Sequence, residues 1–173
     1  GNVTSEFSTD SFESLATATV SDSTLSVADL NGAISAANTA TSGTSTVFSL
    51  SAGATINTGD QSAFTTLLGY ETATQITISD QNITVDPGTT VNVDNANLLN
   101  DTTTGTVTAE ITSSSVDTLK TLTGTNAYTI TIASGDATGT TATELNTIDA
   151  ATTVTIDAGE ITSIEGTYDQ IVA

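Results

Sequence analysis

The sequence predicts a β-rich repeat protein, a parallel β-solenoid in which short strands alternate with short helical turns. Runs rich in Thr, Val and Ile recur along the chain, and these residues favour strands. Each run is followed by a polar segment that carries Leu and has helical spacing. The run centres lie 24 to 30 residues apart, a spacing typical of stacked repeats. The six centres are Val20, Phe48, Ile78, Val107, Ile132 and Ile156.

The predicted elements follow one another as six strand-and-helix units. The strands are expected at 17–22, 46–50, 74–80, 105–112, 127–134 and 152–157. The helical segments are expected at 26–38, 60–70, 94–100, 114–124, 141–150 and 160–166. In the strands at 129–132 and 153–156, Thr alternates with an aliphatic residue, so one face is buried and the other is wet. Helical crossovers between successive strands favour a parallel sheet.

Local signals support several boundaries. Ser26 with Asp29 matches a helix capping pattern, and Asp60 is a suitable cap for the second helix. Gly69 is the expected end of that helix. In the third unit a turn at 86–88 precedes a further extended segment at 89–93, so this unit is longer than the others.

The predicted domain organisation is an N-terminal arm or cap at 1–15 and a single repeat domain of about six coils at 16–173. The arm stands outside the repeat and holds two of the four Phe residues, Phe7 and Phe12. The open end of a solenoid needs such apolar cover, because it otherwise exposes core.

The principal alternative fold is an all-β sandwich of the adhesin type, which also combines Thr-rich strands with Asp, Asn and Gly turns. A recurring Leu-Asn piece after a strand favours the solenoid. It occurs at 29–31, 97–100 and 144–146.

The composition excludes several classes of function. Twenty acidic residues face one basic residue, Lys120, and the net charge is −19, so the chain repels nucleic acid and anionic lipid. No run approaches the roughly 20 apolar residues of a membrane span, so no membrane insertion is expected. The chain has no Cys and no His, which removes the usual nucleophile and base pairs. We therefore expect a protein that is not an enzyme.

Calcium is the one cofactor that the residues suggest, because it binds carboxylate and amide oxygens. The best cluster is Asp80, Asn82 and Asp86, with Asp94 a short distance along the chain. The alternative, which we favour, is that these residues stabilise turns.

A third function follows from the Thr faces of the strands. Stacked Thr-x-Thr motifs at 17–19, 129–131 and 153–155 resemble the hydroxyl ladder of ice-binding solenoids. The ladder is interrupted, with Val47 and Ser49 on either side of Phe48. High β-propensity of Thr explains the same pattern without a ligand.

The repeat resembles a known group of sequences. Segments such as TITISD, VDTLKTLTG and ATELNTIDAATTVTIDAGEITSIEG are similar to the Thr/Ala/Asp-rich tandem repeats of very large predicted surface proteins of marine picocyanobacteria and their phages. The similarity covers 74–173 well and 17–73 loosely. It implies an extracellular structural protein on a cell or virion surface, and it assigns no site residue.

The leading functional hypothesis is a subunit that stacks end to end into a filament, sheath or phage appendage. Its contacts are expected in the arm at 1–15 and in the last segment at 167–173, so a homo-oligomer or polymer is expected. The alternatives are a calcium-stabilised adhesin module on a cell or virion surface and an ice-binding Thr ladder.

Overall fold

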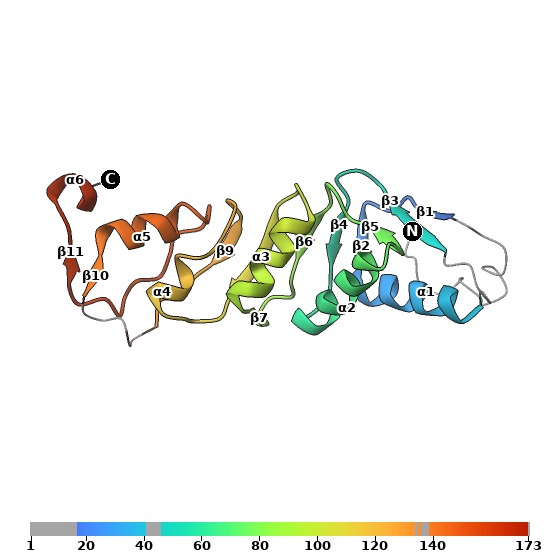
Figure 1. Ribbon diagram of the computed structural model, residues 1–173, viewed down its shortest axis with the longest axis horizontal. Helices are drawn as coiled ribbons and strands as arrows, with labels where there is room; N and C mark the ends of the chain where they lie inside the picture. The colour runs from blue at the N-terminus through green and yellow to red at the C-terminus, as the bar shows by residue number, and fades with distance from the viewer. Residues whose placement is uncertain (1–16, 41–45, 134, 136–138, 173) are drawn as a thin grey trace. The chain divides into compact units, whose positions relative to one another are not determined.

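A computed structural model describes residues 17–40, 46–133, 135 and 139–172 (Figure 1). The arm predicted at 1–15 lies outside the described residues. The chain divides into two compact units. Unit 1 contains residues 1–86 and 102–106, and unit 2 contains residues 87–101 and 107–173.

Unit 1 contains two parallel ladders of short strands. The first ladder has the order β1 (Thr17–Val20), β3 (Val47–Leu50) and β5 (Ile76–Thr77). The second has the order β2 (Thr24–Ser26), β4 (Thr55–Asn57) and β6 (Asn82–Thr84). Helix α1 (Val27–Ala40) follows β2, and helix α2 (Gln61–Thr72) follows β4. Strands that are neighbours in a ladder are therefore about one repeat apart in the sequence.

Register places apolar residues above one another in each ladder of unit 1. Phe48 lies opposite Ile76 in the first ladder, and Ile56 lies opposite Leu25 and Ile83 in the second. All five side chains are buried. Because each such burial contributes roughly 1.5–3 kcal/mol, these aligned rows form the core that joins successive repeats.

Unit 2 continues the alternation of strands and helices. Its strands are β7 (Thr90–Val91), β8 (Val107–Ile111), β9 (Ala127–Thr129), β10 (Thr140–Thr141) and β11 (Ile164–Glu165). Its helices are α3 (Val93–Thr102), α4 (Val116–Leu119), α5 (Ala142–Asp149) and α6 (Tyr168–Ile171). β8 pairs with β7 and β9, and β10 pairs with β11, all in parallel. Parallel bridges also join Ser114 to Ile132, Asn126 to Thr152, and Thr131 to Asp157.

The two units confirm the coarse prediction of parallel strands alternating with helices. The period of two predicted at 129–132 is confirmed, because Ile130 and Ile132 are buried while Thr129 and Thr131 are exposed. β8, within the strand predicted at 105–112, shows the same alternation of buried and exposed residues. The described pairings within each unit are parallel, whereas the sandwich alternative requires antiparallel sheets. No closed barrel is formed by the described strands.

The structure adds strands that the sequence did not indicate. β2, β4 and β6 lie in segments predicted to be connections. Each is three residues long and contains one buried aliphatic residue, namely Leu25, Ile56 or Ile83. A single apolar residue carries no periodicity, so these strands are identified only by the neighbours with which they pair.

The strand predicted at 152–157 is wrong, and so is the helical segment predicted at 160–166, where the structure has no helix and residues 164–165 form β11. The described pairings of 152–157 with the preceding repeat are isolated bridges near its ends, at Thr152 and Asp157. Val154, which the alternating pattern placed inside, is 37% exposed. The alternation of Thr and aliphatic residues in this segment suggested a strand, but between Thr152 and Asp157 the segment has no continuous partner strand to pair with.

The second helix begins as predicted and ends later than predicted. The Asp60 carboxylate accepts a hydrogen bond from the backbone N–H of Ala63 at 2.9 Å, which confirms the cap. The helix does not end at Gly69 but continues to Thr72, and the chain turns away at Thr74 with φ of 59°. A glycine within a helix costs only about 1 kcal/mol relative to Ala, and the buried Leu67 and Leu68 beside it offset that cost.

Candidate functional site: contacts between successive repeats

The candidate site is the contact by which one repeat joins the next within a unit. A repeat here means a strand segment together with the helix or turn after it. Since parallel strand pairing needs only backbone, the specificity of this contact comes from polar side chains at three kinds of position.

Hydroxyl side chains make the first kind of contact. In each case the backbone N–H and the side-chain hydroxyl of one residue both donate to the same carbonyl of the preceding repeat. The pairs are Ser51 with Val20, Thr104 with Ser79, and Thr153 with Asn126. The distances are 2.8–3.1 Å from the nitrogen and 3.0–3.3 Å from the hydroxyl. A carbonyl has two lone pairs, so this double contact uses both of them.

Two buried threonines make the second kind of contact, in which the side-chain hydroxyl both donates and accepts. The Thr103 hydroxyl donates to the Gln81 carbonyl at 2.6 Å and accepts from the Gly105 N–H at 2.9 Å. The Thr152 hydroxyl donates to the Tyr128 carbonyl at 2.6 Å and accepts from the Val154 N–H at 3.1 Å. These threonines are 8% and 7% exposed, so their hydroxyls replace water at the point where the ladder would otherwise leave polar groups unpaired.

Asparagine side chains make the third kind of contact, from one helix to the following repeat. Each side-chain amide donates to a main-chain carbonyl 24 or 32 residues later. The pairs are Asn31 with Ala63 at 2.9 Å, Asn97 with Thr121 at 2.9 Å, and Asn146 with Gln170 at 3.0 Å. Asn97 also accepts from the Thr123 N–H at 2.9 Å. All three asparagines lie in the recurring pieces at 29–31, 97–100 and 144–146, where Asn31 and Asn146 follow a Leu and Asn97 precedes one. The sequence marked these pieces without revealing the role of the asparagines.

The most enclosed polar network in unit 2 is centred on Asn126, which is 3% exposed. Its carbonyl oxygen accepts from the Val107 N–H, and its amide donates to the Asn100 side chain, both at 2.9 Å. The amide also lies 3.2 Å from the Tyr128 hydroxyl, which donates to the Ala96 carbonyl at 3.2 Å. This network satisfies every polar group of the Asn126 side chain, which is what makes its burial tolerable.

Burial raises the pKa of Tyr128 to about 12. Removal of the ring from water is the principal cause, and the nearby negative charge of Asp101 acts in the same direction. The hydrogen bond with Asn126 acts in the opposite direction and is the smaller effect. Tyr128 is therefore a neutral donor at ordinary pH.

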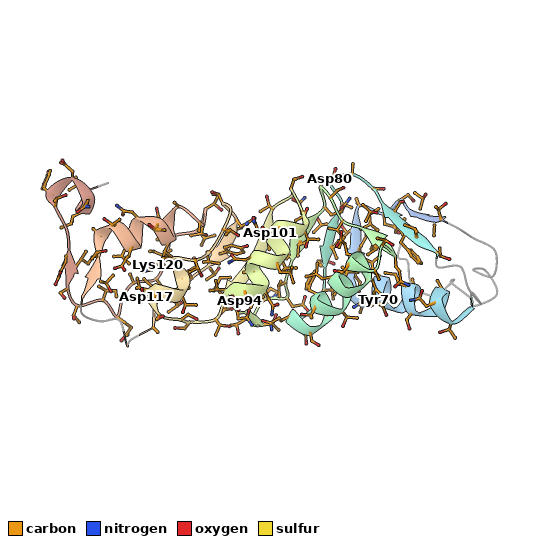
Figure 2. The ribbon with its side chains drawn as sticks, viewed as in Figure 1. Tyr70, Asp80, Asp94, Asp101, Asp117 and Lys120 are labelled. Carbon is orange, nitrogen blue, oxygen red and sulfur yellow. The ribbon has the colours of Figure 1, made fainter. Side chains whose placement is uncertain are left out.

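Lys120 joins two repeats of unit 2 by ion pairs (Figure 2). Its ammonium lies beside Asp117, one turn earlier in its own segment, and 3.2 Å from Glu144 in the next repeat. The hydrogen bond to Asp117, and then that to Glu144, raises the pKa of Lys120. Hydrogen bonds from the Thr141 backbone and hydroxyl, and then from Lys120, lower the pKa of Glu144. A lysine that acts as a nucleophile needs a lowered pKa. The raised pKa of Lys120 instead keeps its ammonium charged, which suits this lysine to ion pairing between repeats.

The residues predicted to bind calcium make other contacts in the structure. The Asp80 carboxylate accepts from the Gln81 side chain at 2.8 Å, and the side-chain amide oxygen of Asn82 accepts from the Thr106 N–H at 2.9 Å. Asp86 and Asp94 belong to different units. Within the described ranges, no group of three or more carboxylate, His or Cys residues is placed to hold a metal ion. Calcium binding by Asp80, Asn82, Asp86 and Asp94 stays a prediction.

The Thr faces form short and mixed rows of side chains. In unit 1, Thr19 lies opposite Ser49, which lies opposite Thr77. In unit 2, the row of side chains across β7, β8 and β9 places Glu110 opposite both Thr90 and Thr129. A carboxylate within the row breaks the repeat of hydroxyl and methyl groups on which an ice-binding surface depends.

Comparison with known proteins identifies no relative. No family model, no curated protein and no solved structure matches the chain. None of the helices in the described part of the chain has the length and apolar character needed to cross a bilayer.

Proposed function

We propose that this protein is a structural subunit without catalytic activity that stacks end to end into a filament, sheath or phage appendage. The observation that supports the proposal is the repeated contact between successive repeats. Parallel strands, hydroxyl pairs and asparagine amides recur there, with apolar rows beneath them. A repeat of this kind buries its apolar face only against another repeat, so a terminal repeat is a ready surface for a neighbouring molecule.

The finer architecture in this proposal is a parallel β-solenoid in each unit. Paired residues in the strands of unit 1 are 27 to 31 positions apart in the sequence, as in Thr24 with Thr55 and Thr55 with Asn82. This nearly constant separation supports a solenoid, in which each strand pairs with the same strand of the next repeat. The arm at 1–15 and the segment at 167–173 are proposed to supply contacts between molecules. Such a contact joins two different surfaces and does not need to close into a ring, so it produces fibres.

The proposed location is outside the cell, on a cell or virion surface. The acidic composition, which includes neither of the sulfur-containing residues Cys and Met, supports it, together with the resemblance of 74–173 to tandem repeats of surface proteins. Net charge of −19 keeps such a chain soluble.

Electron microscopy of the full chain, and of a variant that lacks residues 1–15, tests the proposal. We expect filaments from the full chain and fewer or shorter filaments from the variant. Filaments that are unchanged by the deletion contradict the role of the arm. A chain that sediments as a monomer at all protein and salt concentrations contradicts end-to-end stacking itself.

A further inference from the structure

The first repeat of unit 1, residues 17–40, contains the only Asn-Gly pair of the sequence, Asn31 followed by Gly32. Asparagine is a thermolabile residue. Glycine after it hinders its breakdown least, because glycine has no Cβ beside its nitrogen. In the equivalent pieces, Asn97 is followed by Leu and Asn146 by Thr. The first repeat therefore differs from the later ones in the chemistry open to its contact asparagine.

The reaction open to an Asn-Gly pair is deamidation, which transfers no electrons and needs only water. The Gly32 nitrogen loses its proton to hydroxide and attacks the Asn31 Cγ, and a cyclic imide forms. The side-chain nitrogen takes a proton from water and leaves as ammonia. Water then opens the ring at either carbonyl and gives aspartate or isoaspartate. One carboxylate thus replaces one neutral amide.

The helix blocks this reaction while it is intact. An α-helix commits the N–H of every residue beyond its first turn to the carbonyl four residues earlier, and Gly32 lies beyond the first turn of α1. Helical side chains also point back toward the helix N-terminus, so the Asn31 side chain is directed away from the Gly32 nitrogen. Attack therefore requires α1 to open locally around these two residues.

The same side chain joins the first repeat to the second, residues 46–72. α1 lies beside α2 (Figure 1), and the Asn31 amide donates to the Ala63 carbonyl at 2.9 Å. The Asn31 side-chain oxygen is buried, and no described residue donates a hydrogen bond to it. Asn97, in contrast, also accepts from the Thr123 N–H. Asn31 is therefore held by the group that deamidation removes.

We propose that Asn31 is a spontaneous deamidation site whose rate is set by the opening of α1, and that its product weakens the contact between the first two repeats. Loss of ammonia removes the nitrogen that donates to the Ala63 carbonyl, and the carboxylate that remains repels this carbonyl. Burial of a carboxylate without a partner is unfavourable, and isoaspartate also lengthens the main chain within the helix. Opening of α1 is thereby recorded as a permanent charge. This inference goes beyond the proposed stacking function and does not depend on it.

Incubation of the full chain at pH 8, in buffer and in 8 M urea, tests the site and its control by the helix. Ion exchange separates the more acidic product, and fragmentation mass spectrometry assigns the modified residue. In urea we expect Asn31 to react at least tenfold faster than any other asparagine. In buffer it should react at least tenfold more slowly than in urea, because a closed segment reacts only while it is open. Equal rates at Asn31 in the two solutions, or no preference for Asn31 in urea, overturn the inference.

Gly32→Ala is the matched control for the chemistry. A Cβ at Gly32 would have open space around it, so the methyl group fits the folded helix while it hinders attack on Asn31. The variant should melt no lower than the natural protein and should be modified at Asn31 at least tenfold more slowly in urea. Unchanged modification in this variant contradicts attack by the Gly32 nitrogen.

A second pair of variants tests the effect on the contact between repeats. Asn31→Asp supplies the aspartate product directly, and Ser35→Asp adds the same charge at an exposed position of α1. We expect amide hydrogen exchange in α1 to be at least tenfold faster in Asn31→Asp than in Ser35→Asp, because only position 31 faces the Ala63 carbonyl. Equal exchange in the two variants overturns the proposed weakening of the contact.

Discussion

At the scale of single residues, buried polar side chains determine how closely the repeats approach. Asn126 and Tyr128 connect main-chain groups of neighbouring segments, and both are at most 3% exposed. Gly124 lies beside this network with φ of 75°, and a Cβ there would be 2.1 Å from the Asn100 side-chain oxygen. Loss of one partner in such a network leaves a buried group unsatisfied, which costs about 1–3 kcal/mol.

The first prediction concerns alkaline pH. The pKa of Tyr128 is about 12 in the folded protein and about 10 in an unfolded chain. The folded state therefore holds a proton that the unfolded state releases, so the contribution of Tyr128 is complete below pH 10 and is lost as pH rises toward 12. Urea unfolding between pH 9 and 11.5 should show falling stability.

The variant Tyr128→Phe isolates the contribution of this side chain. It should lose about 1–2 kcal/mol at pH 7 because its hydrogen bonds are missing, and it should lose less than the natural protein between pH 9 and 11.5. The raised pKa of Lys120 acts in the same direction, so both proteins are compared in a Lys120→Gln background. Parallel pH curves for the two proteins would show that Tyr128 does not titrate as described.

The second prediction concerns Gly105. A Cβ at this position would lie 2.4 Å from the Gln81 carbonyl oxygen and 2.6 Å from its carbon, so Gly105→Ala forces two backbone segments apart. We expect a loss of about 1–3 kcal/mol, as for other overpacked positions, measured by urea unfolding. Gly53→Ala is an unsuitable control because the φ of Gly53 is 65°, which would strain any residue with a Cβ. Gly135 has no such φ and has open space around its Cβ position. Gly135→Ala should therefore change stability little.

At the scale of elements, short strands and helices are stable because side chains tie each one to the next repeat. α4 and α6 have four residues each, far below the length at which an isolated helix forms. Gln170 in α6 receives the Asn146 amide on its carbonyl and donates from its own side chain to the Thr143 hydroxyl at 2.9 Å. Contacts between repeats, rather than helix propensity, hold these elements in place.

The third prediction tests the asparagine contact. Asn97→Asp replaces the amide that donates to the Thr121 carbonyl with an oxygen that repels it. We expect a loss of about 1–3 kcal/mol at pH 7, with partial recovery below pH 4, where the carboxyl group becomes a donor. The matched control is Asn95→Asp, which adds the same charge to the same helix closer to its N-terminus. Equal losses in both variants would assign the effect to charge alone.

At the scale of the whole molecule, net charge sets the conditions for stability. Twenty acidic residues and one basic residue repel one another more strongly in the folded state, where they are closer together. The ion pairs of Lys120 neutralise only a small part of that charge. Screening of this repulsion by salt should therefore stabilise the folded state.

The fourth prediction concerns this repulsion. Raising NaCl from 20 mM to 1 M should raise the melting temperature by several degrees, because for a chain of this size each 1 kcal/mol corresponds to about 2–4 °C. Circular dichroism measures the transition. Lys120→Gln should show the same or a slightly larger increase, because salt screens the repulsion among the carboxylates in both proteins but weakens the Lys120 ion pairs only in the natural one. A melting temperature that falls with salt contradicts the prediction.

The sequence was sufficient to predict elements that carry their own periodicity or caps. Residues 129–132 show alternating burial, β8 lies within the strand predicted at 105–112, and α2 begins at the Asp60 cap. It was insufficient for β2 and β4, each of which has a single buried residue. It also marked the Leu-Asn pieces as recurrent without showing that Asn31 donates to Ala63, because the two residues are 32 positions apart.

The sequence itself determined the alternation of Thr-, Val- and Ile-rich strands with helical segments in most repeats and the acidic character of the chain, because periodicity, capping and charge are local properties. Only the tertiary structure decided which carbonyl each hydroxyl or amide reaches, and that Asn126 and Thr152 are buried. These contacts join residues about one repeat apart, and such pairings depend on the register between strands. Register is a property of the packed chain, so no single segment contains it.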